Sequence, residues 1–137
     1  MRSTGTLQFS PEIRPGSHTR RDGGSTWWWL IIRCNEELGR LFRHLYSTSH
    51  YRTRSLQAPL WGTHISVIRG EEPPNQDEWG RLDGTEVEFE YDAIFHETDD
   101  YVWCLVECEA VLDLRERLLL PRSPVPALHL TIGNCVD

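Results

Sequence analysis

Residues 27–38 read WWWLIIRCNEEL, and this stretch dominates the expected fold. Its first six residues are continuously apolar, aromatic or β-branched, which is typical of a strand covered on both faces. Asn35 then offers a side-chain oxygen to cap a helix, and two glutamates follow where negative charge is favourable, in the first turn. We therefore expect a strand that leads directly into an amphipathic helix over residues 35–46.

The second half of the chain has the same order of elements. Residues 101–108 form another apolar run, residues 110–120 have a helical pattern, and prolines follow that stop the helix. Each helix is followed by a further strand, over residues 62–68 in the first half and 128–132 in the second. This order favours a duplicated strand-helix-strand unit, and a chance likeness between common patterns is the alternative.

The remaining segments complete a single domain. Residues 1–25 are rich in Gly, Ser, Thr, Arg and Pro and lack a sustained periodicity, so we expect an irregular N-terminal arm. Apolar residues alternate with glutamates over residues 85–91, which predicts a strand with one wet face. We therefore place one domain over residues 26–137.

The composition narrows the classes of function. The chain has 137 residues and a formal net charge of −7, and all 14 basic residues are arginines. A net acidic chain suits long nucleic acid poorly, but a few arginines are enough to hold a small anionic ligand. The sequence lacks an apolar run of about 18 residues and begins without the apolar core of a signal peptide, so we expect no membrane span and a cytoplasmic protein. The sequence leaves the oligomeric state open.

The cysteine spacing argues against a metal site. Cys34, Cys104, Cys108 and Cys135 contain no Cys-x-x-Cys pair. Cys104 and Cys108 lie in an expected strand, where they would be about 13 Å apart and unable to share one zinc ion. We therefore expect buried or half-buried thiols and no bound metal.

Two of the expected strands carry the same four-residue pattern. One reads HISV and starts at His64, and the other reads HLTI and starts at His129. Because side chains alternate across a strand, each histidine shares a face with the hydroxyl two positions later, Ser66 or Thr131. For either histidine alone, an ordinary sheet histidine is the simpler interpretation. Two such motifs at equivalent places in a duplicated unit favour a functional pair.

Two imidazoles and two hydroxyls suit the cleavage of a phosphodiester without a metal or a cofactor. Imidazole titrates near neutral pH, so one ring can take a proton from an attacking hydroxyl and the other can give one to the leaving oxygen. The hydroxyls would donate hydrogen bonds to the non-bridging phosphate oxygens. We therefore expect His64, Ser66, His129 and Thr131 to be the catalytic residues.

The paired His-x-Ser/Thr motifs resemble those of the 2H phosphoesterase superfamily, over about residues 27–133. The resemblance implies an α+β fold of two lobes, in which duplicated strand-helix-strand units place antiparallel sheets around a central cleft lined by both motifs. Residues 58–71, 79–80 and 87–91 are further similar to the phage members of this superfamily that counteract CBASS, a bacterial antiphage immune system.

That resemblance implies a substrate and a reaction. The anti-CBASS members are phosphodiesterases that destroy cyclic di- and trinucleotide signals such as cGAMP in the cytoplasm of the infected host. In the implied scheme, the adjacent ribose 2′-hydroxyl attacks a 3′–5′ phosphodiester bond, and a 2′,3′-cyclic phosphate forms. The sequence does not distinguish the base from the acid, and our working hypothesis has His64 as the base and His129 as the acid.

Four further residues are candidates for substrate binding. Trp28 belongs to a tryptophan triplet in which at least one ring should face the cleft or solvent, and Tyr46 and Trp61 are other candidates for stacking on a base. Arg69 follows the first motif and is placed to neutralise a phosphate. Core packing is the alternative for the aromatic residues, and an ion pair with one of the glutamates that follow is the alternative for Arg69.

Three other functions stay open. An enzyme that opens 2′,3′-cyclic phosphates or processes RNA ends would use the same chemistry, although RNA with many phosphates favours a basic surface. A non-enzymatic sponge for cyclic nucleotides needs phosphate donors but not two groups that titrate near neutral pH. A purely structural domain would leave both motifs unexplained.

Overall fold

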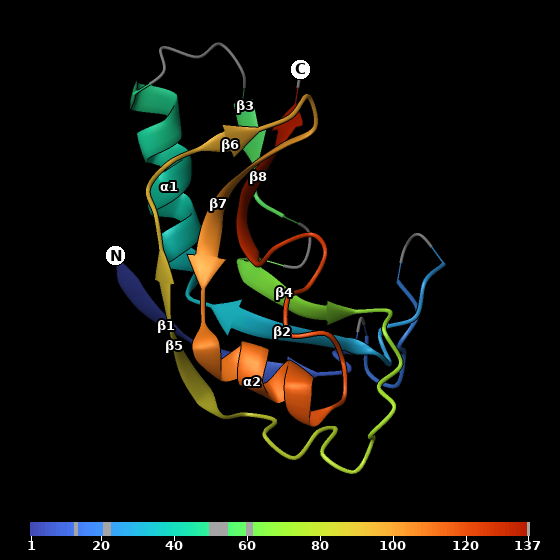
Figure 1. Ribbon diagram of the computed structural model, residues 1–137. Coiled ribbons are helices and arrows are strands. Elements are labelled where there is room, and N and C mark those ends of the chain that lie inside the picture. The colour runs from blue at the N-terminus through green and yellow to red at the C-terminus, as the bar shows by residue number, and fades with distance from the viewer. Residues whose placement is uncertain (13, 21–22, 50–54, 60–61, 137) are drawn as a thin grey trace.

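The computed structural model describes the chain except for residues 13, 21–22, 50–54, 60–61 and 137 (Figure 1). In the described part the strands are β1 (Arg2–Phe9), β2 (Trp29–Cys34), β3 (Ser55–Gln57), β4 (His64–Arg69), β5 (Glu86–Tyr91), β6 (His96–Glu97), β7 (Tyr101–Glu107) and β8 (His129–Val136). The helices are α1 (Glu36–Ser49) and α2 (Glu109–Arg117). Both helices and the strands β2, β4, β5, β7 and β8 lie within a few residues of their predicted positions, and β3 falls in a stretch for which no strand was predicted.

Six strands close into an antiparallel barrel. They pair in the order β8-β4-β2-β1-β5-β7, and β7 pairs with β8 to complete the ring. The short strands β3 and β6 pair with β8 and β7. The predicted α+β fold, with duplicated units forming two lobes around a cleft, is therefore wrong. The hydrogen-bonded pairs run without a break through all eight described strands, so the strands form one continuous sheet, and the described chain adds only two helices to it.

The N-terminal segment accounts for part of this difference. Residues 2–9, expected in an irregular arm, form β1 and lie between β2 and β5. Their apolar pattern is short, because only Leu7 and Phe9 of this strand reach the hydrophobic core. Gly5 allows the close approach of β1 to β2, since a Cβ atom there would lie 2.4 Å from a methyl group of Ile32.

One cluster of buried apolar side chains joins the strands to both helices. Phe42 and Tyr46 of α1 belong to it, as do Val111 and Leu114 of α2. The two helices lie toward opposite ends of the barrel in Figure 1.

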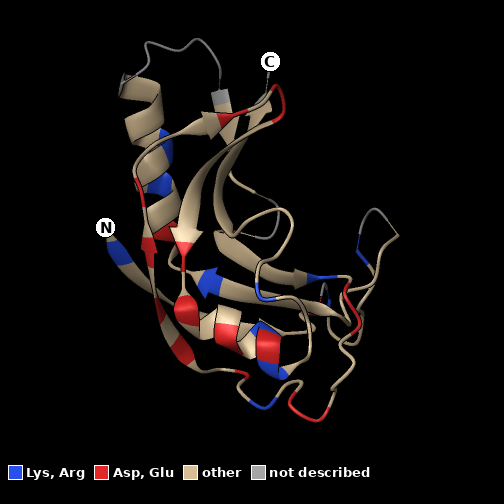
Figure 2. Ribbon diagram, viewed as in Figure 1, with Lys and Arg blue, Asp and Glu red and all other residues tan. Residues whose placement is uncertain are grey.

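Figure 2 shows acidic residues along β5 and α2, and arginines near the ends of β2 and β4. Neither described helix has the length and apolar composition to cross a membrane.

The four cysteines are free thiols, and most of them are buried. Cys34, Cys104 and Cys108 are buried, and Cys135 is half-buried. Burial raises the pKa of the Cys34 and Cys104 thiols to about 12, so both stay protonated near neutral pH. Among the residues that the structure describes, no three or more His, Cys, Asp or Glu side chains are grouped to hold a metal ion.

Candidate active site

The two histidine motifs meet where β4 pairs with β8. Ile65 and Leu130 are direct antiparallel partners, and both are fully buried in the core. Because side chains alternate along each strand, the histidines and hydroxyls on either side of this pair point away from the core. Extending the register by one residue in each direction places each histidine beside the hydroxyl of the other motif. The two histidines are then diagonal neighbours, a relation that typically separates residues by about 7–8 Å.

One cavity collects these side chains. His64, Ser66, His129 and Thr131 all line it, together with Arg69. The loop segment 124–126, between α2 and β8, supplies another wall. The cavity measures about 190 Å³, which is below the range of about 300–1,000 Å³ typical of sites that enclose a whole ligand. Its size suits part of a ligand, the rest of which would lie on the surrounding surface.

The same hydrogen bond orients both imidazole rings. Nδ1 of His64 lies 2.9 Å from the carbonyl oxygen of Gly62, and Nδ1 of His129 lies 2.8 Å from that of Ala127. A carbonyl oxygen only accepts hydrogen bonds, so Nδ1 is the donor in each case. Nε2 is therefore the nitrogen that gains or loses a proton in both rings.

The surroundings of His64 favour its neutral form. Burial is the main reason that the pKa of His64 lies below its ordinary value of 6.5. The charges of Arg33, Arg69 and His129 lower this pKa further, and the hydrogen bond to Gly62 opposes them. A neutral imidazole with a free Nε2 lone pair is suited to act as a general base.

Trp29 forms a platform beneath the cavity. Its indole Nε1–H donates to Ser66 Oγ at 3.1 Å, and its ring meets the edge of the His64 ring with centroids 5.6 Å apart. The guanidinium carbon of Arg69 lies 5.9 Å from the centre of the Trp29 ring. Since the Ser66 oxygen accepts from the indole, its own proton is left to donate to a ligand. Trp29 belongs to the tryptophan triplet, in which Trp28 was the predicted substrate-binding residue.

A β-bulge brings Arg69 to the cavity. Leu30 pairs with Ile68 and Ile31 pairs with Ser66, so Val67 is an extra residue in β4. Without the bulge, Arg69 would share the face of the core residues, because it lies an odd number of positions after His64. The bulge therefore puts Arg69 on the same side as both catalytic candidates of β4.

Arg115 of α2 connects β4 to the loop that walls the cavity. It is buried and donates to both carboxylate oxygens of Glu71, at 2.8 and 2.9 Å. It also donates to the carbonyl oxygens of Val67 and Pro121. Glu71 therefore pairs with Arg115 and is not the partner of Arg69 that the sequence left open. This clamp was missed because α2 contacts β4 only in the folded chain.

The other aromatic candidates lie elsewhere. Tyr46 is fully buried, and its hydroxyl donates to Glu97, so the prediction that it stacks on a base is wrong. Trp28 is half-buried, packs edge-on against Trp79 and does not line the cavity. Trp61 lies outside the described residues.

A different tryptophan stands beside the second motif. Trp103 of β7 is the direct partner of Thr131, and it is half-buried. The ring of His96 stacks on it, and the exposed Tyr101 packs against it with ring centroids 5.7 Å apart. These three rings form an aromatic flank next to the cavity. The sequence alone could not identify it, because the pairing of β7 with β8 brings Trp103 to Thr131.

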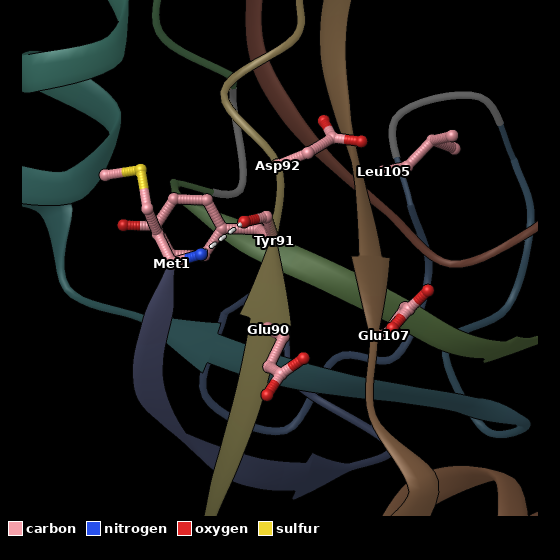
Figure 3. Close-up of a pocket in the computed structure, with 6 residues that line it drawn as sticks. All are labelled: Met1, Glu90, Tyr91, Asp92, Leu105 and Glu107. Atoms are coloured by element: carbon pink, nitrogen blue, oxygen red, sulfur yellow. Dashed lines mark hydrogen bonds between the residues drawn. The ribbon is translucent and has the colours of Figure 1, made fainter.

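A second hollow has the opposite electrostatic character. It measures about 280 Å³ and is bordered by β1, β5 and β7 (Figure 3). Glu90, Asp92 and Glu107 line it, and the Met1 ammonium group donates to the Tyr91 carbonyl oxygen at 3.0 Å. Three carboxylates repel an anion, so this hollow is unsuited to a phosphate.

Comparisons of the chain with protein-family models, with curated proteins and with solved structures give no match. Function is therefore inferred from the residues of the cavity and their geometry.

Proposed function

We propose that this protein is a metal-independent phosphodiesterase of the 2H type that cleaves 3′–5′ bonds in cyclic di- and trinucleotides. One observation carries the proposal: the histidine and the hydroxyl of both motifs line the same cavity. Each motif contributes a hydroxyl and, on the same face, an imidazole whose Nδ1 donates to a carbonyl oxygen. In a phage, this reaction would remove the cyclic nucleotide signal of CBASS.

The two imidazoles account for both proton transfers. His64 Nε2 accepts the proton of the ribose 2′-hydroxyl as its oxygen attacks phosphorus. The bond from phosphorus to the 5′-oxygen breaks, and protonated His129 gives its Nε2 proton to that leaving oxygen. The product is a 2′,3′-cyclic phosphate at the opened end. The lowered pKa of His64 supports its role as the base, because it favours the neutral ring before reaction.

Three further residues of the cavity suit the phosphate charge, and the carboxylate that also lines it, Glu71, is paired with Arg115. Ser66 and Thr131 supply hydroxyl donors to the non-bridging oxygens, on which negative charge increases in the transition state. Arg69 adds positive charge beside them, held over the Trp29 ring. The aromatic flank around Trp103 offers a surface for a base next to Thr131.

One incubation tests the proposal against its rivals. The protein is mixed with a panel of cyclic di- and trinucleotides, 2′,3′-cyclic mononucleotides and short RNAs, with and without excess EDTA, and products are identified by chromatography and mass. We expect linear products from the cyclic oligonucleotides at rates unchanged by EDTA. Cleavage of the mononucleotides or RNA alone would indicate an RNA-end enzyme. A bound but unchanged cyclic nucleotide would indicate a sponge.

A further inference from the structure

A carboxylate stands behind the peptide group that holds His64. Glu36, the first residue of α1, accepts the backbone N–H of Thr63 through Oε1 and the Thr63 hydroxyl through Oε2, both at 3.0 Å. That N–H belongs to the peptide group between Gly62 and Thr63. The carbonyl oxygen of the same peptide group accepts from His64 Nδ1 at 2.9 Å. A continuous chain of hydrogen bonds therefore runs from the carboxylate, through one peptide group, to the imidazole.

Close packing holds this chain in one geometry. Thr63 is buried, and a Cβ atom on Gly39 of α1 would lie 2.4 Å from its hydroxyl oxygen. Gly62 has a φ of +74°, and a Cβ atom there would lie 2.3 Å from Glu36 Oε1. Glycine is thus required at position 62 both for its backbone conformation and for the approach of the carboxylate.

The carboxylate acts on the imidazole through the peptide dipole. A negative charge that accepts from the N–H polarises the peptide and makes its carbonyl oxygen a stronger acceptor. A stronger acceptor at Nδ1 orients the ring and stabilises the imidazolium that forms when Nε2 takes a proton. We propose that Glu36 is a positioning residue for His64 and acts through the Gly62–Thr63 peptide. The catalytic part of this inference rests on the proposed function.

The second motif differs at this point. His129 is held by the carbonyl oxygen of Ala127, whose peptide group carries the N–H of Leu128. Among the described residues, no carboxylate accepts that N–H. In the described part of the chain, a carboxylate therefore stands behind only one of the two rings, the one that accepts the proton in the proposed reaction. This asymmetry agrees with His64 as the base.

Glu36→Gln is the deciding variant, and Glu37→Gln is its matched control. The amide oxygen of glutamine can still accept the Thr63 N–H, and the Thr63 hydroxyl can turn to accept from the amide N–H, so the variant removes the charge while both contacts can be kept. Glu37 lies in the same helical turn but pairs with Arg40. The charged groups that act on His64 from the strands, Arg33, Arg69 and His129, stay in place in both variants.

Four quantities are measured: kcat and KM for the best cyclic nucleotide, and the His64 tautomer and titration by nitrogen NMR. In Glu36→Gln we expect kcat to fall about tenfold with KM nearly unchanged, as for other outer partners of a functional histidine. We also expect a smaller Nδ1–H population and a lower pKa for His64. The His129 signals of this variant should not change, and in Glu37→Gln the His64 signals and kcat should equal those of the wild-type protein. Wild-type kcat together with an unchanged His64 spectrum would overturn the inference.

The NMR readout separates this inference from the proposed function. If the wild-type protein cleaves no nucleotide but Glu36→Gln shifts His64, the positioning role stands and the proposed function fails. If the wild-type protein cleaves cyclic nucleotides and Glu36→Gln changes neither His64 nor kcat, only the positioning role fails. If a Glu36→Ala variant does not fold, the Glu36→Gln measurements alone decide the test.

Discussion

Ile65 and Leu130 are direct partners in the antiparallel pairing of β4 with β8. Both side chains are fully buried, so this pair sets which face of each strand belongs to the core. A slip of one residue in either strand would turn its histidine and hydroxyl toward the core. The cavity therefore depends on a register that the hydrophobic core enforces.

Removing either imidazole should abolish most of the catalysis. We expect His64→Ala and His129→Ala each to lower kcat by about 10²–10⁴-fold, because in the proposed reaction each ring transfers one proton. The measurement is the rate of cyclic dinucleotide opening, followed by chromatography. His44→Ala is the control, since His44 is exposed on α1 and should leave the rate unchanged. Wild-type rates in either cavity variant would rule out its assigned role.

The pH profile should show the lowered pKa of His64. In the proposed mechanism His64 must be neutral to act as the base, so activity should be lost as the pH falls through its pKa, and the acid limb of kcat/KM should lie below 6.5. Arg69→Gln removes one of the charges that lower this pKa, so the limb should move to higher pH. Arg81→Gln, which alters a surface pair with Glu78, should not move it. An acid limb above 6.5 in the wild-type protein would contradict the assignment of the base.

The hydrogen bond from Trp29 to Ser66 should contribute modestly to the rate. Trp29→Phe keeps an aromatic ring beneath His64 but removes the indole donor. We expect kcat to fall about fivefold, which corresponds to the loss of about 1 kcal/mol from one hydrogen bond. The control is Trp27→Phe, at a tryptophan that is 58% exposed. Equal rates in the two variants would show that the platform does not orient Ser66.

The clamp made by Arg115 should stabilise the fold. Arg115→Met leaves Glu71 and two carbonyl oxygens without their donor, and we expect the free energy of unfolding to fall by about 3 kcal/mol. Urea unfolding measures this change. Arg122 contacts three carboxylates on the exposed surface of α2, and Arg122→Met should have a much smaller effect. A larger loss at Arg122 would contradict the importance of the buried clamp.

The aromatic flank should affect binding more than chemistry. We expect Trp103→Ala to raise KM for cyclic dinucleotides about tenfold with little change in kcat, because stacking on one base is worth about 1–3 kcal/mol. Trp28→Ala, at a ring that packs on Trp79 away from the cavity, should leave KM near the wild-type value. The reverse result would move base recognition to the tryptophan that the sequence favoured.

Local patterns were reliable where their cause was local. The strand and helix around Asn35 were predicted because apolar periodicity and capping depend on neighbouring residues. The positions of the aromatic candidates were not predicted correctly. Tyr46, for example, lies on the buried face of an amphipathic helix, and that face is defined by its packing partner. Arg69 was selected by its position after the first motif, but its place at the cavity depends on the bulge at Val67.

The sequence by itself determined the two His-x-Ser/Thr motifs and the shared face of each histidine and its hydroxyl, because alternation is a property of a single strand. Only the tertiary structure decided that both motifs line one cavity, that β1 helps to close a barrel, and that Glu36, Trp29 and Arg115 support the cavity. The reason is physical: strand pairing, bulges and the burial of charged clamps are contacts between segments far apart in the chain. The periodicity of any one segment does not encode its partner.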